Sequence, residues 1–140
     1  MTRVLNYRDE HFDGVDRLWR EVFPGAAPRN RAENAIPSKV ALGDGLFWVA
    51  LDGKGQVIGT AMAGWDGHRG WLYLIATSPD HRRKGVGKAL VERAVAELGK
   101  RGCGKVNLQI RADNVEVASF YASLGFIEEP RMSMGRELPG

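Results

Sequence analysis

The order of apolar and polar residues along the chain predicts alternating helices and strands. Four segments show the three-and-four spacing of apolar residues that is typical of helices: residues 9–22, 29–42, 88–101 and 114–124. Asp9 is the expected cap of the first helix, and Pro24 and Gly25 are expected to end it. Pro37 either breaks the second helix or makes it start late.

Compact or alternating apolar runs predict the strands between these helices. They lie at residues 4–7, 46–51, 57–65, 71–77 and 105–111, with a final hairpin of residues 126–128 and 132–138. Turn sequences DGKGQ and DGHRG join the middle three, which we therefore expect to be antiparallel.

The predicted order is β-α-α-β-β-β-α-β-α-β-β. This order indicates an α/β fold with a mixed central sheet of about six or seven strands, flanked by about four helices. A length of 140 residues suits one domain with one core, so residues 1–140 are expected to form a single domain.

Composition narrows the function classes. The chain is 44% hydrophobic and 26% charged, which is typical of a globular domain. No apolar run approaches the roughly 20 residues of a membrane span, and the first residues lack an apolar signal-peptide core. Cys103 is the only cysteine, so no internal disulfide forms, and we expect a cytoplasmic protein without a membrane partner. His11, His68 and His81 share no ligand spacing, so no metal site is predicted.

The net charge of +3 and the pI of about 9.2 favour an anionic ligand. The sequence shows no surface that combines basic residues with stacking aromatic residues, so we expect no nucleic-acid partner.

The segment SPDHRRKGVGKAL, residues 78–90, carries the clearest chemical signal. Basic residues run into a glycine loop, and a helix begins at once. Free N–H groups and a partial positive charge at a helix N-terminus bind phosphate, and a pyrophosphate is the ligand expected here. Ala89 replaces the hydroxyl residue of a Walker motif, and Leu90 replaces the third glycine of a dinucleotide motif. The alternative is a basic loop that only caps a surface helix.

Two motifs together resemble those of the GNAT N-acetyltransferase superfamily. Residues 82–87 (RRKGVG) fit its Arg/Gln-x-x-Gly-x-Gly/Ala signature. Residues 114–126 (NVEVASFYASLGF) resemble its Asn-x-x-Ala-x-x-(Phe/Leu)-Tyr-x-x-x-Gly-Phe signature. The resemblance covers essentially the whole chain, and residues 64–70 (GWDGHRG) further resemble the YpeA-like bacterial branch.

This resemblance implies acetyl-CoA as the acetyl donor, bound where strands 71–77 and 105–111 separate. The pantetheine arm would pair with the backbone of Ile75, Ala76 and Thr77, and one of their N–H groups would hold the oxyanion. The residues implied for the pyrophosphate are Arg82, Arg83, Lys84, Gly85, Val86 and Gly87. The acceptor site would be built by the first two helices, the loop between them and the later hairpins.

Tyr121 matches the family's proton donor to the leaving thiolate, and the alternative is a core aromatic residue. Asn114 matches a cofactor contact and is also a candidate helix cap. Gln109 stands where some relatives carry a glutamate base, so the base is unassigned. Asp66, in the DGHRG turn, is a candidate wall of the acceptor site, and a solvated turn is the alternative.

The resulting prediction is an acetyl-CoA-dependent N-acetyltransferase that acts on a primary amine of a small molecule or peptide. The alternative is a non-catalytic acyl-CoA binding module with the same fold. The acceptor is not identified by the sequence, and a homodimer is left open.

Overall fold

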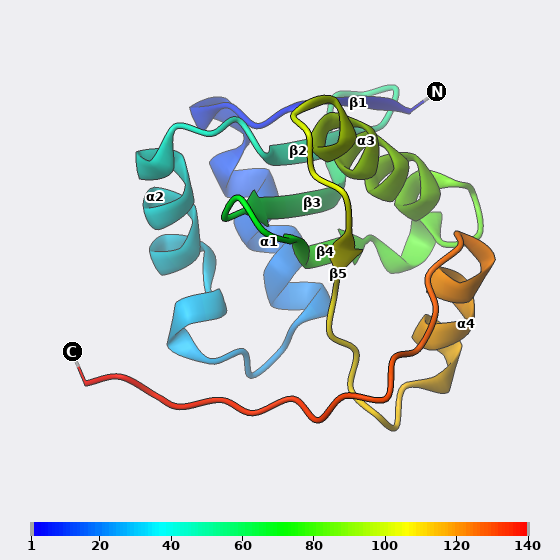
Figure 1. Ribbon diagram of the computed structural model, residues 1–140. Helices are drawn as coiled ribbons and strands as arrows, with labels where there is room; N and C mark the ends of the chain where they lie inside the picture. The colour runs from blue at the N-terminus through cyan, green and yellow to red at the C-terminus, as the bar shows by residue number, and fades with distance from the viewer. Residues whose placement is uncertain (1, 140) are drawn as a thin grey trace. The chain divides into compact units, whose positions relative to one another are not determined.

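The computed structural model describes residues 2–139, which divide into two compact units: one ends at Leu108 and the other begins at Gln109. The first unit contains a five-stranded sheet in the order β1-β2-β3-β4-β5 (Figure 1). Its strands are β1 (Arg3–Asn6), β2 (Phe47–Leu51), β3 (Val57–Trp65), β4 (Gly70–Thr77) and β5 (Val106–Asn107). Neighbours from β1 to β4 are antiparallel, whereas β5 is parallel to β4.

Helices cover both faces of this sheet. They are α1 (Phe12–Val22), α2 (Ala32–Leu42) and α3 (Val86–Lys100). Thr60 of β3 bonds to Trp19 of α1, whereas Gly59 lies against α3. Because successive strand residues point to opposite faces, α1 and α3 lie on opposite sides of β3. The central strand β3 is accordingly buried from Val57 to Ala63.

The first two helices start later than the sequence predicts. A 3₁₀ turn, Asp9–His11, precedes α1, and the Nδ1 atom of His11 accepts a 2.9 Å hydrogen bond from the Arg8 N–H. The turn therefore replaces the predicted cap at Asp9. A second 3₁₀ turn, Pro28–Asn30, precedes α2, which then continues through Pro37 without breaking.

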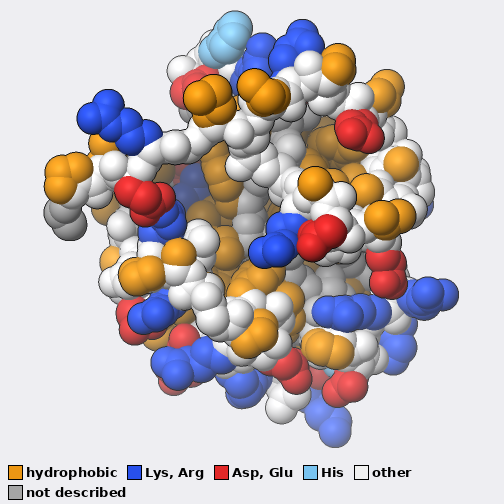
Figure 2. All heavy atoms as spheres, turned by 90° about the horizontal axis from the view of Figure 1, so that it is seen from below, with side chains coloured by type: hydrophobic (Ala, Val, Ile, Leu, Met, Phe, Trp, Pro, Cys, Tyr) orange, Lys and Arg blue, Asp and Glu red, His pale blue; other side chains and the backbone are white. Residues whose placement is uncertain are grey.

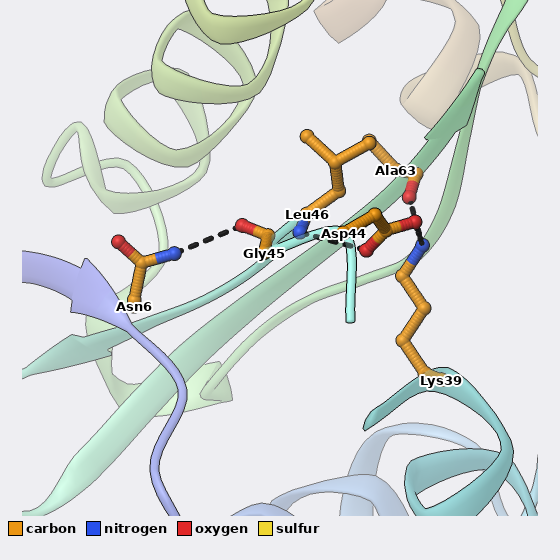
Figure 3. Close-up of polar contacts among 6 residues, drawn as sticks. All are labelled: Asn6, Lys39, Asp44, Gly45, Leu46 and Ala63. Carbon is orange, nitrogen blue, oxygen red and sulfur yellow. Dashed lines mark hydrogen bonds and ion pairs between the residues drawn. The ribbon is translucent and has the colours of Figure 1, made fainter. Parts of the chain in front are cut away.

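A buried lysine fastens the end of α2 to the sheet (Figure 3). The Lys39 ammonium group donates to the Ala63 carbonyl of β3 and lies 2.9 Å from the Asp44 carboxylate. Asp44 also accepts a 3.0 Å bond from the Leu46 N–H at the entry to β2. Only 8% of the Lys39 side chain is exposed, so these partners are what make its burial tolerable.

The second unit contains α4 (Val115–Ser123). Asn114 is its N-cap, and its Oδ1 accepts a 3.2 Å bond from the Val117 N–H, so the predicted capping role is confirmed. Gly125 ends the helix with a φ of +92°, and the Phe126 N–H bonds back to the Tyr121 carbonyl. Within the described residues, no helix is long and apolar enough to cross a membrane.

Two strand predictions are wrong. The strand predicted at 105–111 is paired only at Val106 and Asn107, with β4, and the described residues after Asn107 form no further pairs with the sheet. The hairpin predicted at 126–128 and 132–138 does not form among the described residues. Its segment is exposed from Ile127 onward and contains Pro130, and an isolated hairpin is marginal without a sheet to pack on. The sheet therefore has five strands rather than six or seven.

We predict that Gly59→Ala destabilises the protein by about 1–3 kcal/mol, because β3 has no room for a side chain there. A Cβ atom at Gly59 would lie 2.8 Å from Leu90 Cδ1 and 3.0 Å from Val86 Cγ1 of α3. Gly64→Ala on the same strand is the control, since its Cβ would meet only Tyr73 Cε2 at 3.7 Å. Urea denaturation of both variants measures the difference. Equal stabilities would show that α3 can move away from β3 at no cost.

Candidate active site

Strand β4 carries a bulge in the middle of its pairing with β3. Thr60 pairs with Ala76, but Met62 pairs with Tyr73, so β4 has one residue more than β3 over this stretch. Leu74 has a φ of +46°, a left-handed conformation that costs a residue with a side chain about 1 kcal/mol or more. The structure around Leu74 must therefore hold it in place.

The other edge of β4 is open over most of its length. It pairs with β5 only at Gly70 and Trp71, and no other strand of the described residues joins it. The Ser78 N–H bonds to the Ile58 carbonyl at 2.8 Å, so the next pair, Thr77 with Gly59, is not hydrogen-bonded. By alternation the backbone of Thr77 faces the open edge, and Ala76 faces β3. Of the three residues predicted to pair with the pantetheine arm, Ala76 therefore uses its backbone N–H and C=O groups to pair with β3 and cannot offer them to a ligand.

A 3₁₀ turn, Pro79–His81, follows β4 and is succeeded by the glycine loop, which leads into α3. Arg83 and Gly85 both have positive φ, +64° and +81°, which turns the chain sharply before the helix. Gly85 is the N-cap, and no side chain caps the helix there. Helix α3 begins at Val86, two residues earlier than predicted, so Gly87 belongs to its first turn. The first N–H groups of α3 are thus available to an anion.

The residues around the start of α3 can contribute to a ligand site in two ways, through charged side chains or through backbone groups. Four basic side chains near the helix start are exposed: Arg82, Arg83, Lys84 and Lys88. Val86 is only 2% exposed and packs over Gly59, so it can offer a ligand its backbone alone. On the face drawn in Figure 2, by contrast, Lys and Arg side chains are interspersed with Asp and Glu side chains.

A cleft of about 290 Å³ opens between the end of α1 and the start of α2. Its lining includes Trp19, Phe23, Asp16 and Glu33. The Nε of Arg20, which also lines the cleft, lies 3.1 Å from both carboxylate oxygens of Asp16. The cleft therefore offers an aromatic wall together with carboxylate groups. It lies in the region that the family resemblance implied for the acceptor.

The remaining predicted residues lie in the second unit. Tyr121 belongs to α4, and Asn114 is the N-cap that precedes this helix. Tyr121 is 7% exposed, and its ring contacts Phe120 and Phe126 with centroids 5.0 and 5.6 Å apart. Burial raises the pKa of Tyr121 to about 12. The Gln109 side-chain amide donates to the Ser133 hydroxyl.

Asp66 and Cys103 each form hydrogen bonds within the fold. Asp66 accepts backbone bonds of 2.8 Å from His68 and 3.0 Å from Arg69, and these bonds lower its pKa. A carboxylate held in this way is a poor proton acceptor, which favours the turn-forming alternative. The Cys103 thiol bonds to the Lys105 carbonyl and faces Gly70, which gives it a packing role. No group of three or more metal-ligating side chains occurs within residues 2–139.

Comparison with known proteins identifies the family. The Acetyltransferase (GNAT) family model matches residues 12–126. Acetyltransferase SG1711 of Sodalis glossinidius (strain morsitans) is 37% identical over 133 residues, which are 94% of this chain and 92% of that protein. The chain therefore belongs to the GNAT acetyltransferase family and is an acetyltransferase; enzymes of this family use acetyl-CoA.

Solved structures agree with the fold. The ribosomal-protein-S18-alanine N-acetyltransferase of Escherichia coli has a TM-score of 0.77 and 25% identity, over 92% of this chain and 79% of that one. The enzyme AAC(6')-Iy, in complex with the bisubstrate analogue CoA-S-monomethyl-acetylneamine, has a TM-score of 0.80 and 19% identity, over 99% of both chains.

Sequence reasoning missed two polar residues of the core, Lys39 and Thr60. Thr60 is fully buried, accepts a 2.9 Å bond from Trp19 Nε1 and donates a 2.9 Å bond to the Leu74 carbonyl. The sequence could have indicated this role, because Thr60 carries the single hydroxyl within the apolar run VIGTAMAGW, and a buried hydroxyl needs hydrogen-bond partners inside the protein. The bulge at Leu74 has no comparable signal in the sequence.

We predict that the free energy of unfolding of the wild type, minus that of Tyr121→Phe, is constant below about pH 10 and falls above it. The unfolded tyrosine ionises near its pKa of 10.0, whereas the folded one resists ionisation to about 12. The folded state then holds more protons than the unfolded state, so the stability of the wild type declines with a slope of up to about 1.4 kcal/mol per pH unit.

Urea denaturation of both proteins between about pH 8 and 11 measures this difference. Tyr7 and Tyr73 are present in both proteins, so their ionisation cancels. A difference that stays constant to pH 11 would show that Tyr121 is not protected by burial.

Proposed function

We propose that this acetyltransferase transfers the acetyl group of acetyl-CoA to a primary amine of a small molecule or peptide. One observation carries the proposal: the open edge of β4 is followed, after one 3₁₀ turn, by the loop that presents the uncapped N-terminus of α3. Acetyl-CoA joins an extended pantetheine arm to an anionic pyrophosphate, so its arm can lie along the open edge while its pyrophosphate reaches the loop. The family match across residues 12–126 spans both units and supports one catalytic domain over residues 1–140.

The pantetheine arm would add to β4 as an extra strand. The backbone groups of Ile75 and Thr77 supply its hydrogen bonds, since Ala76 bonds to β3. The pyrophosphate would lie against the N–H groups of residues 82–87, where the exposed basic side chains add full charges. The proposed contact between Asn114 and acetyl-CoA rests on the family motif alone. The Oδ1 atom of Asn114 already accepts the hydrogen bond that caps α4.

The chemistry requires alignment and charge stabilisation more than specialised side chains. The amine nitrogen attacks the thioester carbonyl carbon, a tetrahedral oxyanion forms, and the C–S bond breaks to give the amide and coenzyme A. A backbone N–H of β4 stabilises the oxyanion. The acceptor ammonium loses its proton to solvent, because Gln109 cannot act as a base.

Tyr121 is assigned to the leaving sulfur. Because burial raises its pKa to about 12, the phenol stays protonated at the operating pH. It is therefore able to act as the proton donor to the leaving thiolate that its motif implies, and solvent then returns a proton to the phenolate.

The acceptor is assigned to the cleft between α1 and α2. Trp19 and Phe23 supply an apolar wall. The lining carries equal numbers of carboxylate and guanidinium groups, so it can pair with an ammonium and with an anionic group of one acceptor: Asp16, Glu33, Arg20 and Arg31. The YpeA-like branch rests on residues 64–70 alone and stays a prediction. A screen of small amines and peptides, with coenzyme A release and product mass as readouts, identifies the acceptor. Binding of acetyl-CoA without transfer to any amine would favour the non-catalytic alternative.

We predict that Gly87→Glu weakens acetyl-CoA binding by about 2 kcal/mol or more, roughly 30-fold in Kd. The new side chain places bulk and negative charge in the first turn of α3, where the pyrophosphate would lie. Gly99→Glu adds the same group at the exposed end of the same helix and serves as the control. Calorimetry measures both affinities. Equal Kd values in two folded variants would remove the loop from the binding site.

We predict that Tyr121→Phe lowers turnover by about 10²-fold and leaves the Kd for acetyl-CoA nearly unchanged. The substitution keeps the ring that packs against Phe120 and Phe126 and removes only the hydroxyl. Steady-state kinetics with the amine found in the screen provide the measurement. Wild-type turnover with an altered melting temperature would make Tyr121 a core residue only.

A further inference from the structure

A buried hydroxyl connects three elements of the first unit. Trp19 of α1 donates from Nε1 to the Thr60 hydroxyl of β3 at 2.9 Å, and this hydroxyl donates to the Leu74 carbonyl of β4 at 2.9 Å. Thr60 is fully buried and Trp19 is 3% exposed, so water does not compete for these bonds.

The direction of this chain of hydrogen bonds is fixed by chemistry. An indole N–H can only donate, so Trp19 occupies a lone pair of the Thr60 oxygen. The Thr60 proton is then left for the one remaining partner, the Leu74 carbonyl. Trp19 thus determines which way the hydroxyl points.

The bond to Leu74 orients the next amide along β4. No peptide bond of the described chain is cis, and in a trans peptide the C=O and the following N–H point in opposite directions. Because the Leu74 carbonyl points toward Thr60 on β3, the Ile75 N–H points away from β3, toward the open edge. The hydroxyl also holds Leu74 in its left-handed conformation at the bulge.

We infer that Thr60 is a positioning residue for acetyl transfer. Its hydroxyl aims the Ile75 N–H at the thioester carbonyl, and Trp19 keeps the hydroxyl in the orientation that does so. This inference rests on the proposed function, in which acetyl-CoA lies along the open edge of β4. Trp19 also lines the cleft assigned to the acceptor, so one chain of bonds joins the wall of that cleft to the amide.

Three variants isolate the hydroxyl. Thr60→Val keeps the shape and removes the hydroxyl, and Thr60→Ser restores it. Trp19→Phe removes the indole donor together with part of the buried ring. Val49→Ala is the control for lost core packing, because Val49 is fully buried and pairs with Thr60 across β2 and β3.

We expect Thr60→Val to lower kcat by about tenfold or more, with less than about a threefold change in the Kd for acetyl-CoA. Thr60→Ser returns kcat to within about threefold of wild type, and Trp19→Phe gives an intermediate value. Val49→Ala loses stability and keeps its kcat. A Thr60→Val enzyme with wild-type kcat, or a Val49→Ala enzyme that loses as much, would overturn the inference.

A second measurement needs no acceptor amine. In ¹⁵N-labelled protein, acetyl-CoA should shift the Ile75 amide resonance in wild type and Thr60→Ser, and by less than half as much in Thr60→Val at saturation. An Ile75 response that is absent in wild type or unchanged in Thr60→Val overturns the inference alone. Failure of wild type to bind acetyl-CoA overturns the proposed function as well.

Discussion

The free edge of β4 is the constraint on which the rest of the structure depends. Beyond Trp71 the only strand of the described residues that pairs with β4 is β3, because β5 pairs with it at only two residues. An unpaired strand edge leaves backbone donors and acceptors without partners, and such an edge binds an extended chain readily. The free edge can therefore bind an extended ligand as an added strand. At the same time, this part of β4 lacks a second neighbouring strand that would hold it in place.

Polar groups within the core compensate for that loss of support. Thr60 holds the bulged part of β4 from the side of β3, and Lys39 holds the Ala63 carbonyl further along β3. Each of these buried groups has partners within the protein, which is the condition under which burial of a polar group is tolerated. Both also link a helix to the sheet, so the helices that line the cleft and the strand that offers the amides are fixed to one another.

The anion-binding end of the site depends on close packing rather than on polar contacts. Gly59 has no side chain, and Val86 and Leu90 of α3 occupy the space where its Cβ would lie. The first turn of α3 is therefore pressed against β3, next to the end of β4. Since Gly85 leaves the helix without a side-chain cap, its N–H groups are presented at a fixed position relative to the open edge.

The sequence by itself determined the family, the order of the elements up to α4 and the position of the glycine loop, because these depend on local spacing and on motifs. It could not determine the length of β5, the absence of the final hairpin or the bulge at Leu74, because strand pairing depends on what a distant strand offers. Nor did periodicity assign partners to Thr60 and Lys39. Their roles exist only once α1, α2, β3 and β4 are packed together, since a buried polar group is defined by the neighbours that folding brings to it.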